Sequence, residues 1–423
     1  MRLTRPSPTP PIRTLPDSTM QAVSPSDRGP APVRAAAWGA VLAMALGAFA
    51  LVASEFMPVS LLTPIAHDLR ISEGQAGQAI SVSGAFALLT SLFISSLAGR
   101  RDRKRVLLSL TLLMIVSGTV VAFAPNYLAF IAGRALIGVA IGGFWSMSAA
   151  TAMRLVPDRQ VPRALAIVNG GNALATVVAA PLGSFLGGIV GWRWAFFCVV
   201  PVAAIAFGWK LASLPRMHAT HGSASPGRAF ALLASAPVAL GMTAVSVFFM
   251  GQFTLFTYLR PFLEAVTHAG AAGLSVLLLV IGVAGFAGTI LIGTFLQRGL
   301  YRTLIVIPGL MAAVAIALIA FGHSIGATAA LLAVWGLLGT AAPVGWWTWL
   351  ARALPRDAEA GGGLMVAVVQ LAIALGATAG GVLFDLHGYR ATFGLSAGLL
   401  VAAGVLAALA ARAALRAEAA GPA

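Results

Sequence analysis

The chain has 423 residues, of which 59% are hydrophobic and only 9% are charged. A soluble domain carries roughly 25% charged residues, so this composition excludes a water-covered globular protein and, over most of the chain, a disordered one. The single cysteine, Cys198, excludes an internal disulfide and a cysteine-based metal site.

Residues 1–34 are rich in Pro, Ser, Thr and Arg and contain no apolar run, which predicts a disordered cytoplasmic tail. Twelve apolar runs follow, each long enough to cross a bilayer as a helix. They are 36–63, 77–98, 106–124, 127–150, 164–189, 194–213, 237–260, 273–296, 304–321, 327–350, 362–385 and 391–411. We therefore expect an all-α membrane protein with twelve transmembrane helices in two six-helix halves. Its expected parts are the tail, a bundle over 35–213, a cytoplasmic linker over 214–236, a second bundle over 237–411 and a C-terminal tail over 412–423.

The formal net charge of +15 has a topological explanation. Twelve spans place both termini on one side of the membrane, and most Lys and Arg residues fall in the tails and loops of that side. The opposite side carries only Arg70, Arg193, Arg260 and Arg390. The positive-inside rule then predicts that both termini are cytoplasmic. Because this topology accounts for the basic charge, we expect the lipid bilayer as a partner and no nucleic acid.

The two halves match each other at an offset near 197 residues. The matches are Glu55-Phe56 with Gln252-Phe253, Arg154 and Pro157 with Arg352 and Pro355, Asn172 with Gln370, and Gly191-Trp192-Arg193 with Gly388-Tyr389-Arg390. Such a parallel repeat of six spans is typical of transporters whose substrate site lies between the halves, near the bilayer midplane.

Ionisable residues inside spans are candidates for function. Glu55 is the acid and Arg134 the base that lie well inside predicted spans. Both are expected ~10–12 Å from the periplasmic face, at 1.5 Å of rise per residue. A carboxylate balanced between burial and a nearby guanidinium can bind and release a proton during transport. The alternative is a static pair that holds spans one and four together.

Amides and aromatic rings are the candidates for substrate contacts. Gln252, Asn172, Gln370 and Asn169 should face the bundle interior, to bind polar groups of a substrate or to join helices by hydrogen bonds. The rings of Trp145, Phe253 and Tyr258 can stack on a planar heterocycle, or can serve only packing and interface anchoring.

No pattern of an enzyme is present. His218 and His221 are the only histidines with the spacing of metal ligands, and they lie in the polar linker. The chain has no Gly-rich loop with Lys and Ser for binding phosphates, which argues against ATP-driven pumping. We expect no enzyme activity, no cofactor and no metal.

Span four contains Arg134-Ala-Leu-Ile-Gly138, span five contains Ala180-Pro181-Leu-Gly183-Ser184, and the loop after span two reads Gly99-Arg-Arg-Asp102-Arg103-Lys-Arg105. These three stretches resemble the major facilitator superfamily and its drug:proton antiporter branch. The resemblance implies proton coupling through Arg134, helix packing and movement at Gly138, Pro181 and Gly183, and gating by the basic loop with Asp102 and Arg103. The loop departs from the family pattern, because Ser95 and Gly99 stand where Gly and Asp are usual.

Longer stretches are similar to the members of this family that export purine ribonucleosides. They include Glu55-Phe-Met-Pro-Val-Ser-Leu-Leu-Thr-Pro64, Gly142-Gly-Phe-Trp-Ser-Met-Ser148, Thr257-Tyr-Leu-Arg-Pro261 and Pro343-Val-Gly-Trp346. This resemblance implies a monomer in the bacterial inner membrane that exports inosine- or guanosine-like nucleosides in exchange for protons. The alternatives are a proton-coupled exporter of sugars or hydrophobic drugs, and a non-transporting membrane receptor or enzyme.

Overall fold

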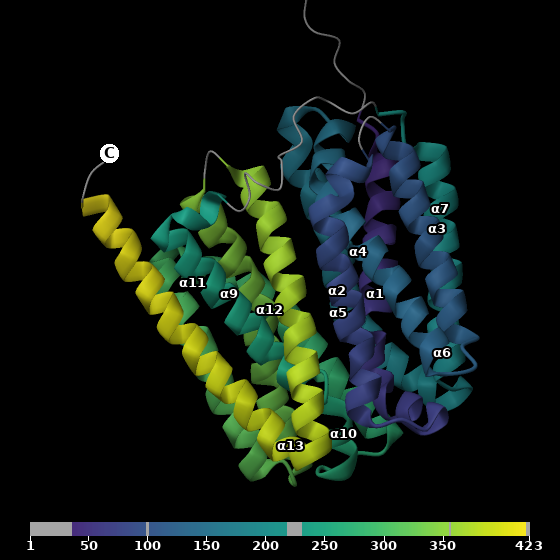
Figure 1. The fold of residues 1–423 in the computed structure, drawn as a ribbon, viewed down its shortest axis with the longest axis vertical. Coiled ribbons are helices and arrows are strands. Elements are labelled where there is room, and N and C mark those ends of the chain that lie inside the picture. Colours follow the sequence, from purple (N-terminus) through teal and green to yellow (C-terminus); the bar gives the residue numbers. More distant parts are fainter. Residues whose placement is uncertain (1–35, 99–100, 218–230, 355–356, 420–423) are drawn as a thin grey trace, which may run out of the picture. The chain divides into compact units, whose positions relative to one another are not determined.

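The computed structural model describes residues 36–98, 101–217, 231–354 and 357–419. This described part consists of α-helices and short 3-10 helices and contains no strand. We call residues 36–217 the first half and residues 231–419 the second half. The first half contains α1 (Trp38–Leu69), α2 (Glu73–Ala98), α3 (Arg103–Ala122), α4 (Tyr127–Leu155), η2 (Asp158–Gln160), α5 (Val161–Val190), α6 (Trp192–Phe197) and α7 (Val199–Ser213). The second half contains η3 (Leu232–Ala234), α9 (Ala236–Phe256), α10 (Leu259–Ala265), α11 (Ala271–Phe321), α12 (Ile325–Ala353) and α13 (Ala358–Ala419) (Figure 1).

Ten helical stretches in the described residues are long and apolar enough to cross a membrane. Two of them, α11 with 51 residues and α13 with 62, far exceed a hydrocarbon core of about 30 Å. Each has a non-helical glycine inside, Gly299 and Gly388. The chain folds back past each glycine, as two hydrogen bonds across these points show. The Thr303 hydroxyl donates to the Phe295 carbonyl at 3.3 Å, and the Thr392 hydroxyl donates to the Gly380 carbonyl at 3.2 Å. These two reversals divide the ten stretches into the twelve spans that hydropathy predicts.

Several helices continue beyond their apolar runs. α1 was expected to end at residue 63, but it runs to Leu69 and places His67, predicted in a loop, in its last turn. It ends where Arg70 adopts the left-handed conformation (φ 55°) and its N–H bonds the carbonyls of Ala66 and His67. α13 runs to Ala419, into the expected tail. Hydropathy marks only the membrane-crossing part of a helix, whereas the backbone hydrogen bonds continue until a residue ends them. The 1–34 tail and the linker residues 218–230, with His218 and His221, lie outside the described residues.

The most extensive contacts between the halves are those of α2 with α13 and of α5 with α11, and smaller ones join α1 to α10 and α4 to α13. Glycines permit close approach at the two extensive contacts. A Cβ on Gly84 would lie 2.9 Å from the carbonyl oxygen of Gln370, and a Cβ on Gly282 would lie 2.6 Å from that of Val177. Real Cβ contacts are not this short, so larger residues at these positions would push the halves apart.

Candidate transport site between the two halves

Glu55 lies in the middle of α1 and is 6% exposed. Its carboxylate oxygen Oε1 accepts a 3.3 Å hydrogen bond from the Nε2 of Gln370 on α13, which is also 6% exposed. The structure thus brings together two site residues that are 315 positions apart in the sequence. This contact joins the first half to the second through a buried ionisable group.

Arg134 of α4 is completely buried and binds backbone rather than the Glu55 carboxylate. Its guanidinium donates to the carbonyls of Ser54 at 2.7 Å, Glu55 at 3.0 Å and Ala79 at 3.1 Å, and to the hydroxyl of Ser83 at 3.2 Å. Arg134 therefore ties α4 to α1 and α2. Its positive charge still lies beside the Glu55 residue, as the sequence predicts from their matching depth.

A proline explains why Arg134 is needed at this place. Pro58 lies inside α1 and has no N–H, so it cannot bond the carbonyl four residues earlier, which belongs to Ser54. A buried carbonyl without a donor is costly, and in lipid no water replaces the missing group. Arg134 supplies that donor. The sequence signal is thus a proline in α1 together with a single arginine in a neighbouring span.

The same relationship recurs at Gln252, the counterpart of Glu55 in the repeat. Pro343 in α12 leaves the carbonyl of Gly339 without its backbone donor, and Gln252 of α9 donates its Nε2 to that carbonyl at 3.4 Å. The other amide atom of Gln252, Oε1, is buried without a hydrogen-bond partner in the described structure. Gln252 therefore holds α9 to α12 and still has one free acceptor.

The predicted stacking residues lie in different surroundings. Phe253 of α9 stacks on Phe56 of α1 with ring centroids 5.7 Å apart and an interplanar angle of 25°, so this ring pair bridges the two halves next to Glu55 and Gln252. Tyr258 is fully buried, donates to the carbonyl of Ala377 at 2.7 Å and stacks on Phe384. Trp145 of α4 is half-buried and contacts Phe144 edge-on.

The two amides of α5 do not share one environment. Asn169 is exposed, and its Nδ2 donates to the carbonyl of Leu165 in its own helix at 3.0 Å. Asn172, three residues later, is half-buried. The amide of Asn169 is thus satisfied locally, which differs from the interior position expected for it.

The motif residues serve helix ends and helix contacts. Asp102 caps α3, since its Oδ1 accepts from the backbone N–H of Lys104 and from that of Met217, both at 2.9 Å. The side chain of Arg103 contacts the sulfur of Met147 at 3.5 Å. The family pattern is not met at Ser95 and Gly99. The side chain of Ser95 and the whole of Gly99 lie outside the described part of the structure.

Three further motif residues lie at close helix contacts. A Cβ on Gly138 would lie 2.9 Å from the Cα of Ser83 in α2, and one on Gly183 would lie 2.6 Å from the hydroxyl of Ser60 in α1. Pro181 leaves the carbonyl of Val177 without a backbone donor, at the point where Gly282 of α11 approaches it. These positions therefore fix the distances between helices.

One sequence expectation is wrong: Arg134 is not the only base inside the bundle. Lys210, which the charge count places among the basic residues of the cytoplasmic tails and loops although it lies within the run 194–213, is 1% exposed inside the first half. Its Nζ donates to the Thr111 hydroxyl at 3.0 Å and lies 5.2 Å from the centroid of the Phe144 ring. A cavity of about 10 Å³ adjoins it. The apolar run around Lys210 ends only three residues later. A lysine at such a position is typical of an anchor at the membrane interface, so the sequence did not indicate its burial.

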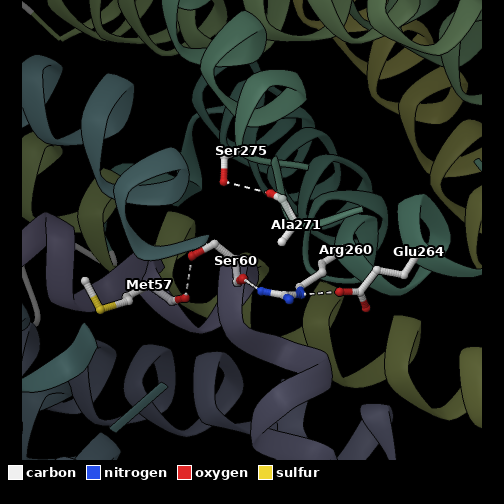
Figure 2. Close-up of polar contacts among 6 residues, drawn as sticks. All are labelled: Met57, Ser60, Arg260, Glu264, Ala271 and Ser275. Carbon is white, nitrogen blue, oxygen red and sulfur yellow. Dashed lines mark hydrogen bonds and ion pairs between the residues drawn. The ribbon is translucent and has the colours of Figure 1, made fainter. Parts of the chain in front are cut away.

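The end of the bundle that contains Asp385 closes through contacts between the halves; we call it the Asp385 end. The Asp385 carboxylate on α13 accepts from the Ser72 hydroxyl at 2.5 Å and from the N–H of Gly74, at the start of α2, at 2.9 Å. Arg260 of α10 donates to the carbonyl of Ser60 in α1 and to Glu264 at 2.8 Å (Figure 2). The carbonyl of Ser60 has no backbone donor, because Pro64, four residues later in α1, lacks an N–H. The sequence analysis placed Arg260 among the charges of the opposite side and gave it no contact. Pro64, which leaves a carbonyl of α1 without its backbone donor, was the sequence signal for such a contact.

The comparison with protein families matches the description "Major Facilitator Superfamily" over residues 44–365. The chain belongs to the major facilitator superfamily. As a member of this superfamily with long apolar helices, the chain is a multi-pass membrane transporter and not an enzyme.

Two relatives that match most of this chain have names that state different functions. The "Transcription regulatory protein OpdE" of Pseudomonas aeruginosa is 62% identical over 373 residues, which cover 88% of this chain and 93% of that protein. The "Purine ribonucleoside efflux pump NepI" of Salmonella typhimurium is 41% identical over 364 residues, which cover 86% of this chain and 91% of that protein.

Solved structures of superfamily members share the fold at low identity. A bacterial homologue of the human lysosomal transporter Spinster, in an inward-facing and unoccupied conformation, matches with a TM-score of 0.72 and 16% identity over 92% of this chain and 99% of the other. The human organic anion transporter MFSD10 matches with a TM-score of 0.63 and 16% identity over 89% of this chain and 100% of the other.

Proposed function

We propose that this transporter exports purine ribonucleosides such as inosine and guanosine from the bacterial cytoplasm in exchange for protons. It acts as a monomer with both termini in the cytoplasm. One observation carries the proposal: a buried carboxyl group, Glu55, lies at the contact between the halves. The 41% identity to a purine ribonucleoside efflux pump supports the choice of substrate.

A carboxyl at this contact suits proton exchange. Moving the halves against each other exposes a midplane site first to one side of the membrane and then to the other. Glu55 takes up a proton on the periplasmic side and releases it on the cytoplasmic side. The charge of Arg134 favours release, while its bonds to backbone keep it from neutralising the carboxylate as a fixed ion pair.

The substrate is held by groups around this carboxyl. The free Oε1 of Gln252 accepts a hydrogen bond from a donor on the base or the ribose. Phe253 and Phe56 present aromatic faces on which a purine stacks. Asn172 and Trp145 contribute a second amide and ring from the first half.

The test is uptake of radiolabelled inosine into inverted membrane vesicles under an imposed proton gradient. We expect accumulation by the wild type and none by Glu55→Gln. Asp68→Asn is the matched control, because Asp68 is an acid of the same helix that pairs with Arg193 at an exposed end; it should accumulate inosine. Accumulation by Glu55→Gln would contradict the coupling role, and no accumulation by wild-type protein would contradict the nucleoside.

A second candidate rests on the other relative. The 62% identity to a protein named as a transcription regulator favours a membrane receptor that senses a small molecule and changes gene expression. Binding of inosine without accumulation, together with altered transcripts in a deletion strain, would support this candidate. Export of sugars or hydrophobic drugs is separated by replacing inosine with those compounds in the same vesicles.

A further inference from the structure

The side-chain amide of Gln370 contacts Glu55, and a role in substrate binding alone does not explain this contact. Its Nε2 donates to the Glu55 carboxylate, while its Oε1 is buried and has no hydrogen-bond partner in the described structure. A buried amide usually has both ends satisfied, since an unpaired polar atom costs free energy. The unpaired atom lies on the same amide group that already contacts Glu55.

Close contacts between α13 and α2 hold the backbone of Gln370 in place. Its carbonyl oxygen would lie 2.9 Å from a Cβ at Gly84, so α13 and α2 touch directly at this residue. Two turns further along α13, the Thr378 hydroxyl lies 2.9 Å from that of Ser81 on α2. The backbone of Gln370 is therefore fixed at the contact of the halves, and a half-turn of its terminal amide would exchange Nε2 and Oε1 without moving the helix.

The groups that face Glu55 leave Gln370 as its side-chain partner. From α4 comes the charged Arg134, whose guanidinium bonds backbone carbonyls and the hydroxyl that α2 presents, Ser83. From α9 comes the ring of Phe253, through its stack on Phe56. From α13 comes the amide of Gln370. Arg134 is thus the one charged group among these, and it is committed to other acceptors.

We propose that Gln370 is a positioning residue that binds Glu55 in both of its protonation states. Ionised Glu55 accepts from Nε2, as in this structure. When Glu55 takes a proton from water, its new O–H donates to Oε1 after the amide rotates by half a turn. No bond other than hydrogen bonds forms or breaks in Gln370. The amide thus transmits proton binding on α1 to α13 of the other half.

This inference rests on the proposed proton exchange at Glu55, but it is tested without any substrate. The probe is the protonated carboxyl vibration in infrared difference spectra of the purified full chain in lipid, recorded between acid and alkaline buffer. The Glu55 band is the one that disappears in Glu55→Gln. In Gln370→Met, which keeps shape but cannot hydrogen-bond, we expect this band to shift to the higher frequency of an unbonded carboxyl. In Thr378→Val, which loses hydrogen bonds of the same helix contact, the band should stay in place.

The transport assay gives a second readout. Gln370→Met should lose gradient-driven accumulation by about tenfold, the effect of removing a hydrogen bond to a charged group. Exchange of labelled for unlabelled inosine without a gradient should remain within about twofold of wild type, since that exchange needs no proton. The double variant Glu55→Gln with Gln370→Glu moves the carboxyl to the other half and should regain part of the accumulation.

Each contrary result has a distinct meaning. An unshifted carboxyl band in Gln370→Met overturns the role of Gln370, whatever the substrate is. Loss of exchange together with accumulation also overturns it, because Gln370 would then contact the substrate. If Glu55→Gln removes no carboxyl band from the wild-type difference spectrum, or if that variant accumulates inosine, the proposed function itself is contradicted. If Gln370→Met does not fold, the double variant decides: no recovered accumulation and no carboxyl band overturns the inference.

Discussion

Arg134 replaces the hydrogen bond that Pro58 cannot make. It donates at 2.7 Å to the Ser54 carbonyl, four residues before the proline, in the turn next to Glu55. The relationship recurs twice, since Gln252 bonds the carbonyl freed by Pro343 and Arg260 bonds the carbonyl freed by Pro64. Prolines inside these helices therefore create the acceptors to which polar side chains of neighbouring helices bind.

The first prediction is that the stability effects of Arg134 and Pro58 are coupled. Arg134→Met should lower the free energy of unfolding by roughly 1–3 kcal/mol for each buried carbonyl left without a donor. In a Pro58→Ala background the loss should be smaller, because the new N–H of residue 58 bonds the Ser54 carbonyl. Denaturation of the four proteins in detergent measures the double-mutant cycle. Additive losses would show that the proline does not determine the need for Arg134.

The second prediction concerns the contact of Arg260 with Ser60, which joins α10 to α1. Arg260→Gln should open the Asp385 end more often, because Gln is too short to reach the freed carbonyl. In a Cys198→Ser, Thr378→Cys background, a maleimide reagent should label residue 378 about fivefold faster, as for a loss of about 1 kcal/mol. Arg193→Gln is the control, since Arg193 pairs with Asp68 within one half. Equal rates for the two variants would contradict a gating role of Arg260.

The third prediction uses the 2.5 Å contact between the Ser72 hydroxyl and the Asp385 carboxylate. Ser72→Cys with Asp385→Cys, in a Cys198→Ser background, should be joined by a short bifunctional thiol reagent. The link should abolish transport, because the Asp385 end has to open in each cycle. A reducible reagent allows the link to be cut, and transport should then return. Full transport by the linked protein would show that this end stays closed during the cycle.

The fourth prediction concerns Lys210 and Gly47. A Cβ on Gly47 would overlap the space of the Lys210 Nζ, so the amine has to move away and lose its hydrogen bond to Thr111, and Gly47→Ala should lower the free energy of unfolding by about 1 kcal/mol. Most of this cost should vanish in a Lys210→Ala background. Lys210→Met keeps the volume and removes a buried amine whose hydrogen-bond partner is Thr111, so it should not lower stability. A destabilised Lys210→Met protein would indicate a stronger electrostatic partner for this lysine.

Local sequence features were sufficient for the membrane class and the approximate positions of the spans. Hydropathy depends on the solvent that each stretch meets, so the run at 36–63 marks α1 even though the helix continues to Leu69. The match of Glu55 with Gln252 depends only on spacing along the chain. Even Arg134 was singled out without structure, because a lone charge in a lipid-crossing helix is costly unless it has partners.

The tertiary structure decided which groups those residues bind. Glu55 and Arg134 share a depth, but the rotation of α4 directs the guanidinium to carbonyls that Pro58 and the neighbouring turns offer. Gln370 contacts Glu55 because glycine at position 84 lets α13 approach the first half. Lys210 is buried because α7 packs on α1, with room at Gly47 for its amine. Hydropathy and spacing act along one chain segment, whereas these contacts depend on the rotation and distance of helices that are far apart in the sequence.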